Sequence, residues 1–344
     1  MSGRRAAPVV AMWSVGRSRC AFVSLLHGES QEYLAYALVL GRRLRQECPG
    51  VDRVLLLGPG QWRSRAARAA LAWAGWSYVW AVHPIRAGHL DKSGRHGLVF
   101  TKLRALEVPY ERIVLLDLDL LPRCGSDLRS LFAVGAPAGK YFGEYQGRHG
   151  DLIGPEARRP FWCPNTGVLR LDPRPTRWAR RAQVAGLVGR LSSPAAVRAC
   201  YSYLPDQYFL AWVWGGWRHI HECYNYEVAI GVGDAWQGPP ISVPDVLRAT
   251  RVWHFSGKCG LQPYMFCDLD DAADVCAWLG RHCGDQDPEG LIARAFAEWA
   301  GAWGELLCDA AVPSLVRGIH HTLRSRARAA RETIVHWRAG RWGS

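Results

Sequence analysis

The first third of the chain alternates between two kinds of hydrophobic pattern, and this alternation limits the folds available to it. Continuous apolar runs of strand length are separated by segments whose apolar residues recur every three or four positions. The strand-like runs are Cys20–Leu26, Val51–Gly58, Ser77–Val82 and a fourth within Arg112–Pro122. The helical segments between them are Gln31–Glu47, Trp62–Ala74 and Thr101–Glu107. Such alternation predicts an α/β domain with a parallel, doubly wound sheet, which binds ligands beyond the carboxyl ends of its strands.

The rest of the chain is less regular until its last 60 residues. We expect strands at Val168–Leu171 and Arg251–Phe255, and helices at Thr176–Leu191 and Asp206–Trp214. Beyond Pro288 the apolar residues follow the spacing of an amphipathic helix; they are Ile292, Phe296, Trp299, Trp303 and Leu306. We therefore divide the chain into a flexible N-terminus (1–18), one α/β domain (19–285) and a helical, basic C-terminal extension (286–344).

The positive charge of the chain has two interpretations, an acidic binding partner or a biased amino-acid composition. The net charge is +13, which suits an acidic partner, but only four of the 43 basic residues are Lys and the chain has only two Asn. Such a composition indicates sequence bias, so we expect no specific nucleic-acid partner. The basic segment 312–344 fits a solvated helix packed against the domain better than a helix on an anionic membrane surface, and peripheral membrane contact stays the alternative.

The cysteines and the hydropathy of the chain indicate where in the cell the protein is located. The eleven cysteines form no C-x-x-C pair, so we expect neither a zinc site of the usual spacing nor structural disulfides. The longest uncharged run, Ala69–Val82, is too short to cross a bilayer. We expect a cytoplasmic location.

The sharpest chemical signal is the segment "RIVLLDLDLLP", where Asp117 and Asp119 follow a buried hydrophobic strand. Residues two apart on a strand point to the same side, so the two carboxylates converge if the pleat continues through them. Neighbouring carboxylates repel each other, and a hard divalent cation such as Mg²⁺ or Mn²⁺ removes that cost. The alternative is a pair of solvated acids at a strand end.

Three further segments carry polar residues of interest. The segment "NTG" (Asn165–Gly167) precedes the expected strand Val168–Leu171, where its asparagine fits a tight turn. Asp206 and Gln207 begin a helix, so Asp206 is a candidate for its N-cap as well as for catalysis. His254 ends a strand and is followed by Gly257 and Lys258. Such a group can supply a metal ligand, close backbone approach and a positive charge for phosphate, although a lone histidine is more often structural.

Taken in order, the segments "AFVSLL", Tyr33 with "ALVLG", "FTKLRAL", "LLDLDLL", "PNTGVL", "DQ" and "HFSGK" resemble the glycogenin and galactinol-synthase-like family of retaining glycosyltransferases. The resemblance extends from about Cys20 to Tyr264. It implies the GT-A (nucleotide-diphospho-sugar transferase) fold, a Rossmann-like mixed sheet flanked by helices. It also implies a UDP-sugar donor and a divalent metal, Mn²⁺ or Mg²⁺.

The resemblance also implies roles for individual residues. Leu25 and Tyr33 would flank the uracil. Asp117, Asp119 and His254 would hold the metal, with Leu118 between the two acids at the nucleotide. Gly257 and Lys258 would contact phosphate. The remaining matched positions would line the sugar, with Lys102, Asp206 and Gln207 as the catalytic candidates; they are Arg95, Lys102, Asn165, Gly167, Asp206 and Gln207.

Some features remain open at this stage. Relatives carry an additional acid just before the Asp-Gln pair, where this chain has Tyr201–Pro205, so the sugar is not determined. The acceptor is a carbohydrate, a lipid or a protein, and a homodimer is compatible with the resemblance. Two other functions stay in view: a haloacid dehalogenase-like phosphatase, which also uses Asp-x-Asp after a strand, and a catalytically silent carbohydrate-binding protein on the same fold.

Overall fold

The computed structural model describes residues 19–94, 96–141, 147–154, 163–228, 242–256, 260–269, 271–283 and 290–342. The strands are β1 (Cys20–Leu26), β2 (Asp52–Leu57), β3 (Tyr78–Ala81), β4 (Arg112–Leu116), β5 (Leu120–Pro122), β6 (Ala138–Tyr141), β7 (Leu152–Ile153), β8 (Pro164–Leu171), β9 (Trp217–His219), β10 (Tyr226–Glu227) and β11 (Val252–His254). The α-helices are α1 (Gln31–Glu47), α2 (Arg65–Ala74), α3 (Arg177–Leu191), α4 (Pro194–Cys200), α5 (Pro205–Trp214), α7 (Val243–Ala249), α8 (Ala272–Cys283), α9 (Leu291–Leu307) and α10 (Ser314–Trp342). Short 3₁₀ helices include η3 (Val99–Glu107), η4 (Leu128–Ala133), η6 (Glu222–Tyr224) and η7 (Pro263–Phe266).

The main sheet has the strand order β3-β2-β1-β4-β8-β6-β9-β7. The first four strands of this order are mutually parallel, whereas β8 runs antiparallel to both β4 and β6. The mixed sheet flanked by helices is therefore confirmed, and the fully parallel sheet expected from the alternation of strands and helices is wrong beyond β4. A parallel neighbour is usually reached through an α-helical crossover, and the described residues between β4 and β8 include no α-helix.

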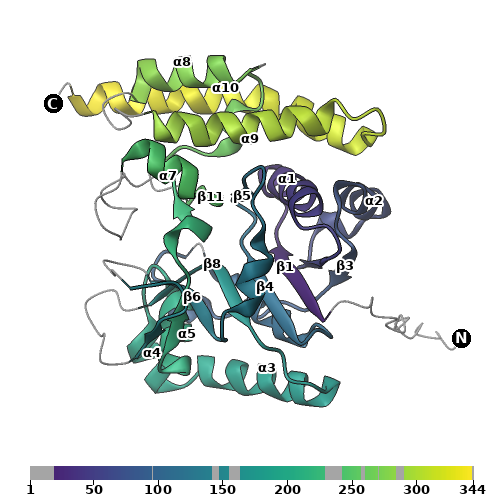
Figure 1. The fold of residues 1–344 in the computed structure, drawn as a ribbon, viewed down its shortest axis with the longest axis vertical. Helices are drawn as coiled ribbons and strands as arrows, with labels where there is room; N and C mark the ends of the chain where they lie inside the picture. Colours follow the sequence, from purple (N-terminus) through teal and green to yellow (C-terminus); the bar gives the residue numbers. More distant parts are fainter. Residues whose placement is uncertain are drawn as a thin grey trace, which may run out of the picture.

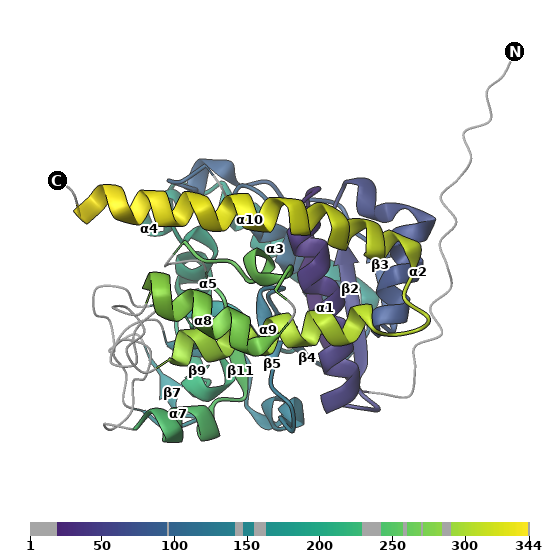
Figure 2. The ribbon, with the colours of Figure 1, turned by 90° about the horizontal axis from the view of Figure 1, so that it is seen from above.

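Each face of the main sheet has its own hydrophobic core, because alternate residues of each strand point to opposite faces. On β1, Phe22 packs toward α1 and the C-terminal helices, while Ala21 and Val23 pack toward η3, α3 and α5. Figure 1 shows α1 and α2 on one side of the sheet and α3 on the other, with α8, α9 and α10 as a further layer beyond α1. Figure 2 shows α10 crossing above α1.

A second, three-stranded sheet of order β10-β11-β5 adjoins the main sheet where β4 ends. The pleat does not continue through the two aspartates as the sequence suggested. β4 stops at Leu116, and Asp117–Asp119 form a turn that leads into β5 of the second sheet. Backbone bonds hold this turn from both sides, because Asp117 N donates to the carbonyl oxygen of Gly167 and Phe255 N donates to that of Asp119.

The C-terminal amphipathic helix is confirmed as α9, and all five residues of its predicted apolar face are buried. The basic segment 312–344 is also helical, because the whole of α10 lies within it. The ten cysteines within the described residues have free thiols, and Cys259 lies outside those residues. None of the described helices combines the length and the apolar character needed to span a membrane.

Candidate functional site

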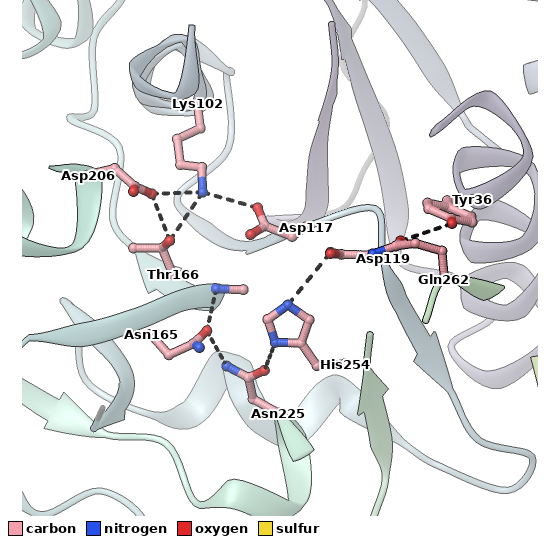
Figure 3. A network of polar contacts seen from close by, with 11 residues as sticks. Tyr36, Lys102, Asp117, Asp119, Asn165, Thr166, Asp206, Asn225, His254 and Gln262 are labelled. Atoms are coloured by element: carbon pink, nitrogen blue, oxygen red, sulfur yellow. Dashed lines mark hydrogen bonds and ion pairs between the residues drawn. The ribbon is translucent and has the colours of Figure 1, made fainter. Parts of the chain in front are cut away.

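Two carboxylates and one imidazole meet where the two sheets join. Asp117 and Asp119 come from the turn after β4, and His254 comes from the last position of β11, which pairs with Leu120 of β5 in antiparallel register. One ligand atom from each of the three side chains lies within 4.8 Å of the others. His254 Nε2 is 3.7 Å from Asp119 Oδ1 (Figure 3). The register of β5 and β11 thus joins residues that are 135 positions apart in sequence.

Within the part of the chain that the structure describes, the formal charges around this group do not balance. Burial raises the pKa of Asp119 to about 6; the nearby His254 opposes this shift and the negative charge of Asp117 adds to it. Lys102 Nζ lies 3.1 Å from Asp117 Oδ1 and 3.0 Å from Asp206 Oδ2. Three described carboxylates, those of Asp117, Asp119 and Asp206, face the one ammonium group of Lys102, a formal excess of two negative charges before His254 is counted. That excess matches a divalent cation, and carboxylate oxygens with an imidazole nitrogen are a donor set that Mn²⁺ and Mg²⁺ accept.

Lys102 of η3 is the centre of a second polar group on the opposite side of Asp117 from His254 (Figure 3). Its ammonium group donates to Asp206 Oδ2 and, at 3.2 Å, to Thr166 Oγ1, which itself donates to Asp206 Oδ2 at 2.7 Å. Burial alone would lower the pKa of Lys102, but the carboxylates of Asp117 and Asp206 raise it above its ordinary value. Burial would likewise raise the pKa of Asp206, but Lys102 and the Thr166 hydroxyl hold it below its ordinary range. Both groups are therefore charged at neutral pH.

Buried amide side chains fix the ring of His254. Its Nδ1 lies 2.8 Å from Asn225 Oδ1, and Asn225 Nδ2 donates to Asn165 Oδ1 at 2.9 Å. Asn165 Oδ1 also accepts from the backbone N–H of Gly167 at 2.9 Å. The two asparagines of the chain thus bond to each other behind the metal-ligand candidates (Figure 3).

Gly167 lies against the ring of His254. A Cβ atom at this position would be 2.7 Å from His254 Cε1 and 3.0 Å from Nδ1, which is too close for ordinary van der Waals contact. Any larger residue would push the imidazole away from the two aspartates. The predicted glycine at the sugar site therefore has a steric explanation, which is the close approach of strand β8 to β11.

For two of these residues, Asn165 and Asp206, the local structure expected from the sequence is wrong. Asn165 is not in a tight turn before a strand but inside β8, where its side chain points into the site. Asp206 is not the N-cap of α5; Leu204 holds that position, and Asp206 is free to bond Lys102 and Thr166. Gln207 is buried beside it and its Oε1 lies 3.5 Å from Cys163 Sγ.

The predicted nucleotide residues are divided between described and undescribed parts of the chain. Leu25 is half-buried at the carboxyl end of β1, Leu118 is buried between the two aspartates, and Tyr33 is 47% exposed in the first turn of α1. Three predicted residues lie outside the described residues; they are Arg95, Gly257 and Lys258.

Two residues of the network were missed from the sequence. Thr166 lies between Asn165 and Gly167, which were both predicted site residues. Nothing in the local sequence indicated that its hydroxyl bonds Asp206. Asn225 follows Tyr224, and its rarity in this chain was the available signal. Neither contact can be read from local spacing. Thr166 meets Asp206 because α5 packs against β8, and Asn225 meets His254 because β10 pairs with β11.

No protein-family model matches the sequence. An uncharacterized protein of Acanthamoeba polyphaga mimivirus is 30% identical over 176 residues, which cover 47% of this chain and 58% of that protein. The chain thus spans a little over half the length of this curated relative. Among solved structures, the galactosyltransferase LgtC in complex with donor and acceptor sugar analogs is similar, with 18% identity and a TM-score of 0.54, over 87% of this chain and 99% of LgtC.

A second structure of LgtC, an active-site mutant, matches over the same shares of the two chains, with 17% identity and a TM-score of 0.53. At this level of identity the likeness concerns the fold. The chain has the mixed α/β fold of the GT-A glycosyltransferases, and its group of two aspartates and a histidine lies at the carboxyl end of β4.

Proposed function

We propose that the protein transfers a sugar from a UDP-sugar to an acceptor hydroxyl with retention of configuration, assisted by Mn²⁺ or Mg²⁺. The observation that carries this proposal is the convergence of Asp117, Asp119 and His254 on a GT-A fold. Such sheets bind ligands beyond the carboxyl ends of their strands, which is where this group lies. Retention and the choice of UDP rest on the family resemblance of the sequence motifs.

The three side chains would hold the cation through carboxylate oxygens and His254 Nε2. When bound, the cation supplies positive charge to the diphosphate leaving group. Lys102, the only ammonium group in the network of Figure 3, keeps Asp117 and Asp206 close together while balancing part of their charge. Both bonds to Asp206 end on Oδ2, so Oδ1 is the oxygen that a sugar hydroxyl would meet.

The remaining site residues have positions that agree with sugar binding. Asn165 and Gly167 are buried on β8, between the polar group around Lys102 and the metal-ligand candidates. Gln207 lies next to Asp206 in the sequence and is also buried. Arg95, Gly257 and Lys258 stay predictions for the sugar and phosphate contacts. LgtC, in complex with donor and acceptor sugar analogs, supports a carbohydrate as the acceptor class.

A donor-turnover assay tests the proposal. Purified protein is incubated with UDP-glucose, UDP-galactose, UDP-xylose or UDP-glucuronate, with Mn²⁺ or with EDTA, and the nucleotide products are separated. Slow release of UDP from one donor, only with Mn²⁺, is expected even without an acceptor. In a parallel incubation with para-nitrophenyl phosphate, release of inorganic phosphate without any turnover of a UDP-sugar would favour a phosphatase. Metal-dependent UDP binding without turnover would favour a catalytically silent binding protein. Either result would overturn the proposal.

A further inference from the structure

A cavity of about 690 Å³ lies on the α1 side of the aspartate pair. Its walls come from the first turns of α1, from the segment around η7 and from α10. Among the lining residues are Glu32, Tyr33, Tyr36, Gln262, Thr322 and Arg326. The volume falls within the range of roughly 300–1,000 Å³ that is typical of small-molecule sites.

This cavity adjoins the group of metal-ligand candidates. In Figure 3, Tyr36 and Gln262 lie on the side of Asp119 that faces away from His254. The rings of Tyr33 and Tyr36 are in edge-to-face contact, with centroids 5.6 Å apart. Burial, and after it the charges of Asp119 and Asp117, raise the pKa of Tyr33 above its ordinary value. A diphosphate held at the aspartates can therefore direct its nucleoside toward this cavity.

Helix α10 is fixed at the far wall of the cavity. Arg326 forms an ion pair of 2.5 Å with Glu32, which also accepts from Ser30 Oγ at the N-cap of α1. Leu323 and Ala327, on either side of Arg326, are completely buried in the core. One turn further on, Arg331 forms a bidentate ion pair with Asp268, and both side chains are less than 10% exposed. Ion pairs and buried side chains therefore hold α10 in a fixed position at this side of the cavity.

The cavity also offers polar groups to a ligand. Tyr36 donates its hydroxyl proton to Gln262 Oε1 at 3.2 Å, which leaves the Gln262 amide N–H groups as donors. Gln31, another lining residue, has a buried side-chain oxygen with no hydrogen-bond partner among the described residues. The exposed part of the Tyr33 ring supplies an apolar surface for a base.

We propose that α10 completes the nucleoside-binding part of the donor site, with the base and ribose of a nucleoside diphosphate held between Tyr33 of α1 and Thr322 of α10. This inference rests on the proposed function, because it takes the diphosphate to lie at Asp117, Asp119 and His254. It makes the C-terminal helix part of the donor site, and it assigns Thr322, Arg326 and Gln262 a role in selecting the nucleoside.

Calorimetry with two ligands tests this inference. UDP and inorganic pyrophosphate are each titrated, with Mn²⁺, into the full chain, because pyrophosphate has no nucleoside. Thr322→Trp fills the cavity from α10, and Thr333→Trp is its matched control, since both threonines donate to the carbonyl four residues earlier on the same helix and Thr333 is exposed. Arg326→Ala and Arg328→Ala form a second pair with the same change in charge, and Arg328 is exposed on α10.

Thr322→Trp and Arg326→Ala should weaken UDP binding by about tenfold or more, an effect of the size of one or two lost contacts. Neither should change the affinity for pyrophosphate, and both controls should bind UDP like the unmodified protein. Unchanged UDP affinity in Thr322→Trp, or equal losses for UDP and pyrophosphate, would overturn the inference. If the unmodified protein bound neither ligand with Mn²⁺, the proposed function would fail instead.

Discussion

The hydrogen bonds of His254 determine which of its ring nitrogens can bind a cation. Asn225 Nδ2 donates to Asn165 Oδ1, so the oxygen of the Asn225 amide is the atom that faces His254. An oxygen can only accept, so the proton of the imidazole lies on Nδ1 and the lone pair on Nε2. Nε2 is the nitrogen that faces Asp119. Partners of this kind orient metal-binding histidines in proteins generally.

Asn225→Ala should therefore weaken Mn²⁺ binding by about 10- to 100-fold, the usual cost of losing such a partner. Asn225→Asp keeps an acceptor for the Nδ1 proton and should bind Mn²⁺ more tightly than Asn225→Ala does. Calorimetric titration with Mn²⁺ measures both, with circular dichroism as a check that each variant is folded. An alanine variant with the affinity of the unmodified protein would show that Asn225 does not position the ring.

Asp119 is expected to be the less replaceable of the two acids, because it is 19% exposed where Asp117 is 33% exposed and paired with Lys102. Asp119→Asn keeps the size of the side chain and removes its charge, so it should abolish Mn²⁺-dependent UDP binding and leave the fold intact. Asp274→Asn, on the exposed face of α8, is the matched control. Calorimetry with UDP and Mn²⁺ decides, and unchanged binding by Asp119→Asn would remove this residue from the site.

At the scale of elements, the close contact between β8 and β11 makes a prediction about Gly167. The added methyl group of Gly167→Ala would overlap the ring of His254, so this variant should lose Mn²⁺ binding as Asp119→Asn does. Gly189→Ala, on α3, is the control, because its Cβ would meet no atom within 4 Å. Alanine is favoured over glycine within a helix by about 1 kcal/mol, so the control should be slightly stabilised. Metal titration and thermal unfolding measure both effects, and a Gly167→Ala variant with full metal affinity would contradict the steric argument.

The sequence could predict elements better than their directions and partners. β1 was predicted from Cys20 to Leu26 and α1 from Gln31 to Glu47, because continuous apolar runs and helical periodicity are local signals. The direction of β8 was not predictable, since it depends on the connection that leads into it. The two aspartates do converge, but through a turn between two sheets and not through a continued pleat. His254 reaches them through the pairing of β5 with β11, which no local pattern encodes.

At the scale of the whole molecule, the C-terminal helices and the α/β part share one hydrophobic core. A single cluster of buried side chains runs from Phe22 of β1 through α1 to Trp303 of α9 and Ala327 of α10. The ring of Trp299 is perpendicular to that of Tyr36, with centroids 5.7 Å apart. Glu298 joins α9 to the second sheet, because it pairs with Arg123 and accepts from Trp253 Nε1. The extension predicted from residue 286 onward is thus connected to the aspartate-bearing sheets by both packing and ion pairs.

We therefore expect the chain to unfold as one cooperative unit, and a pair of tryptophan variants tests this. Trp299 is 2% exposed, so Trp299→Ala should cost about 3–5 kcal/mol of unfolding free energy through the cavity that it leaves. Trp178 of α3 is 77% exposed, so Trp178→Ala should change stability by no more than about 0.5 kcal/mol. Because Trp299 lies in the shared core, its loss should lower one transition that is seen together by tryptophan fluorescence, by circular dichroism and by the release of Mn²⁺-dependent UDP binding. If the C-terminal helices were an independent unit, Trp299→Ala would lower a separate transition and leave the midpoint of ligand release unchanged.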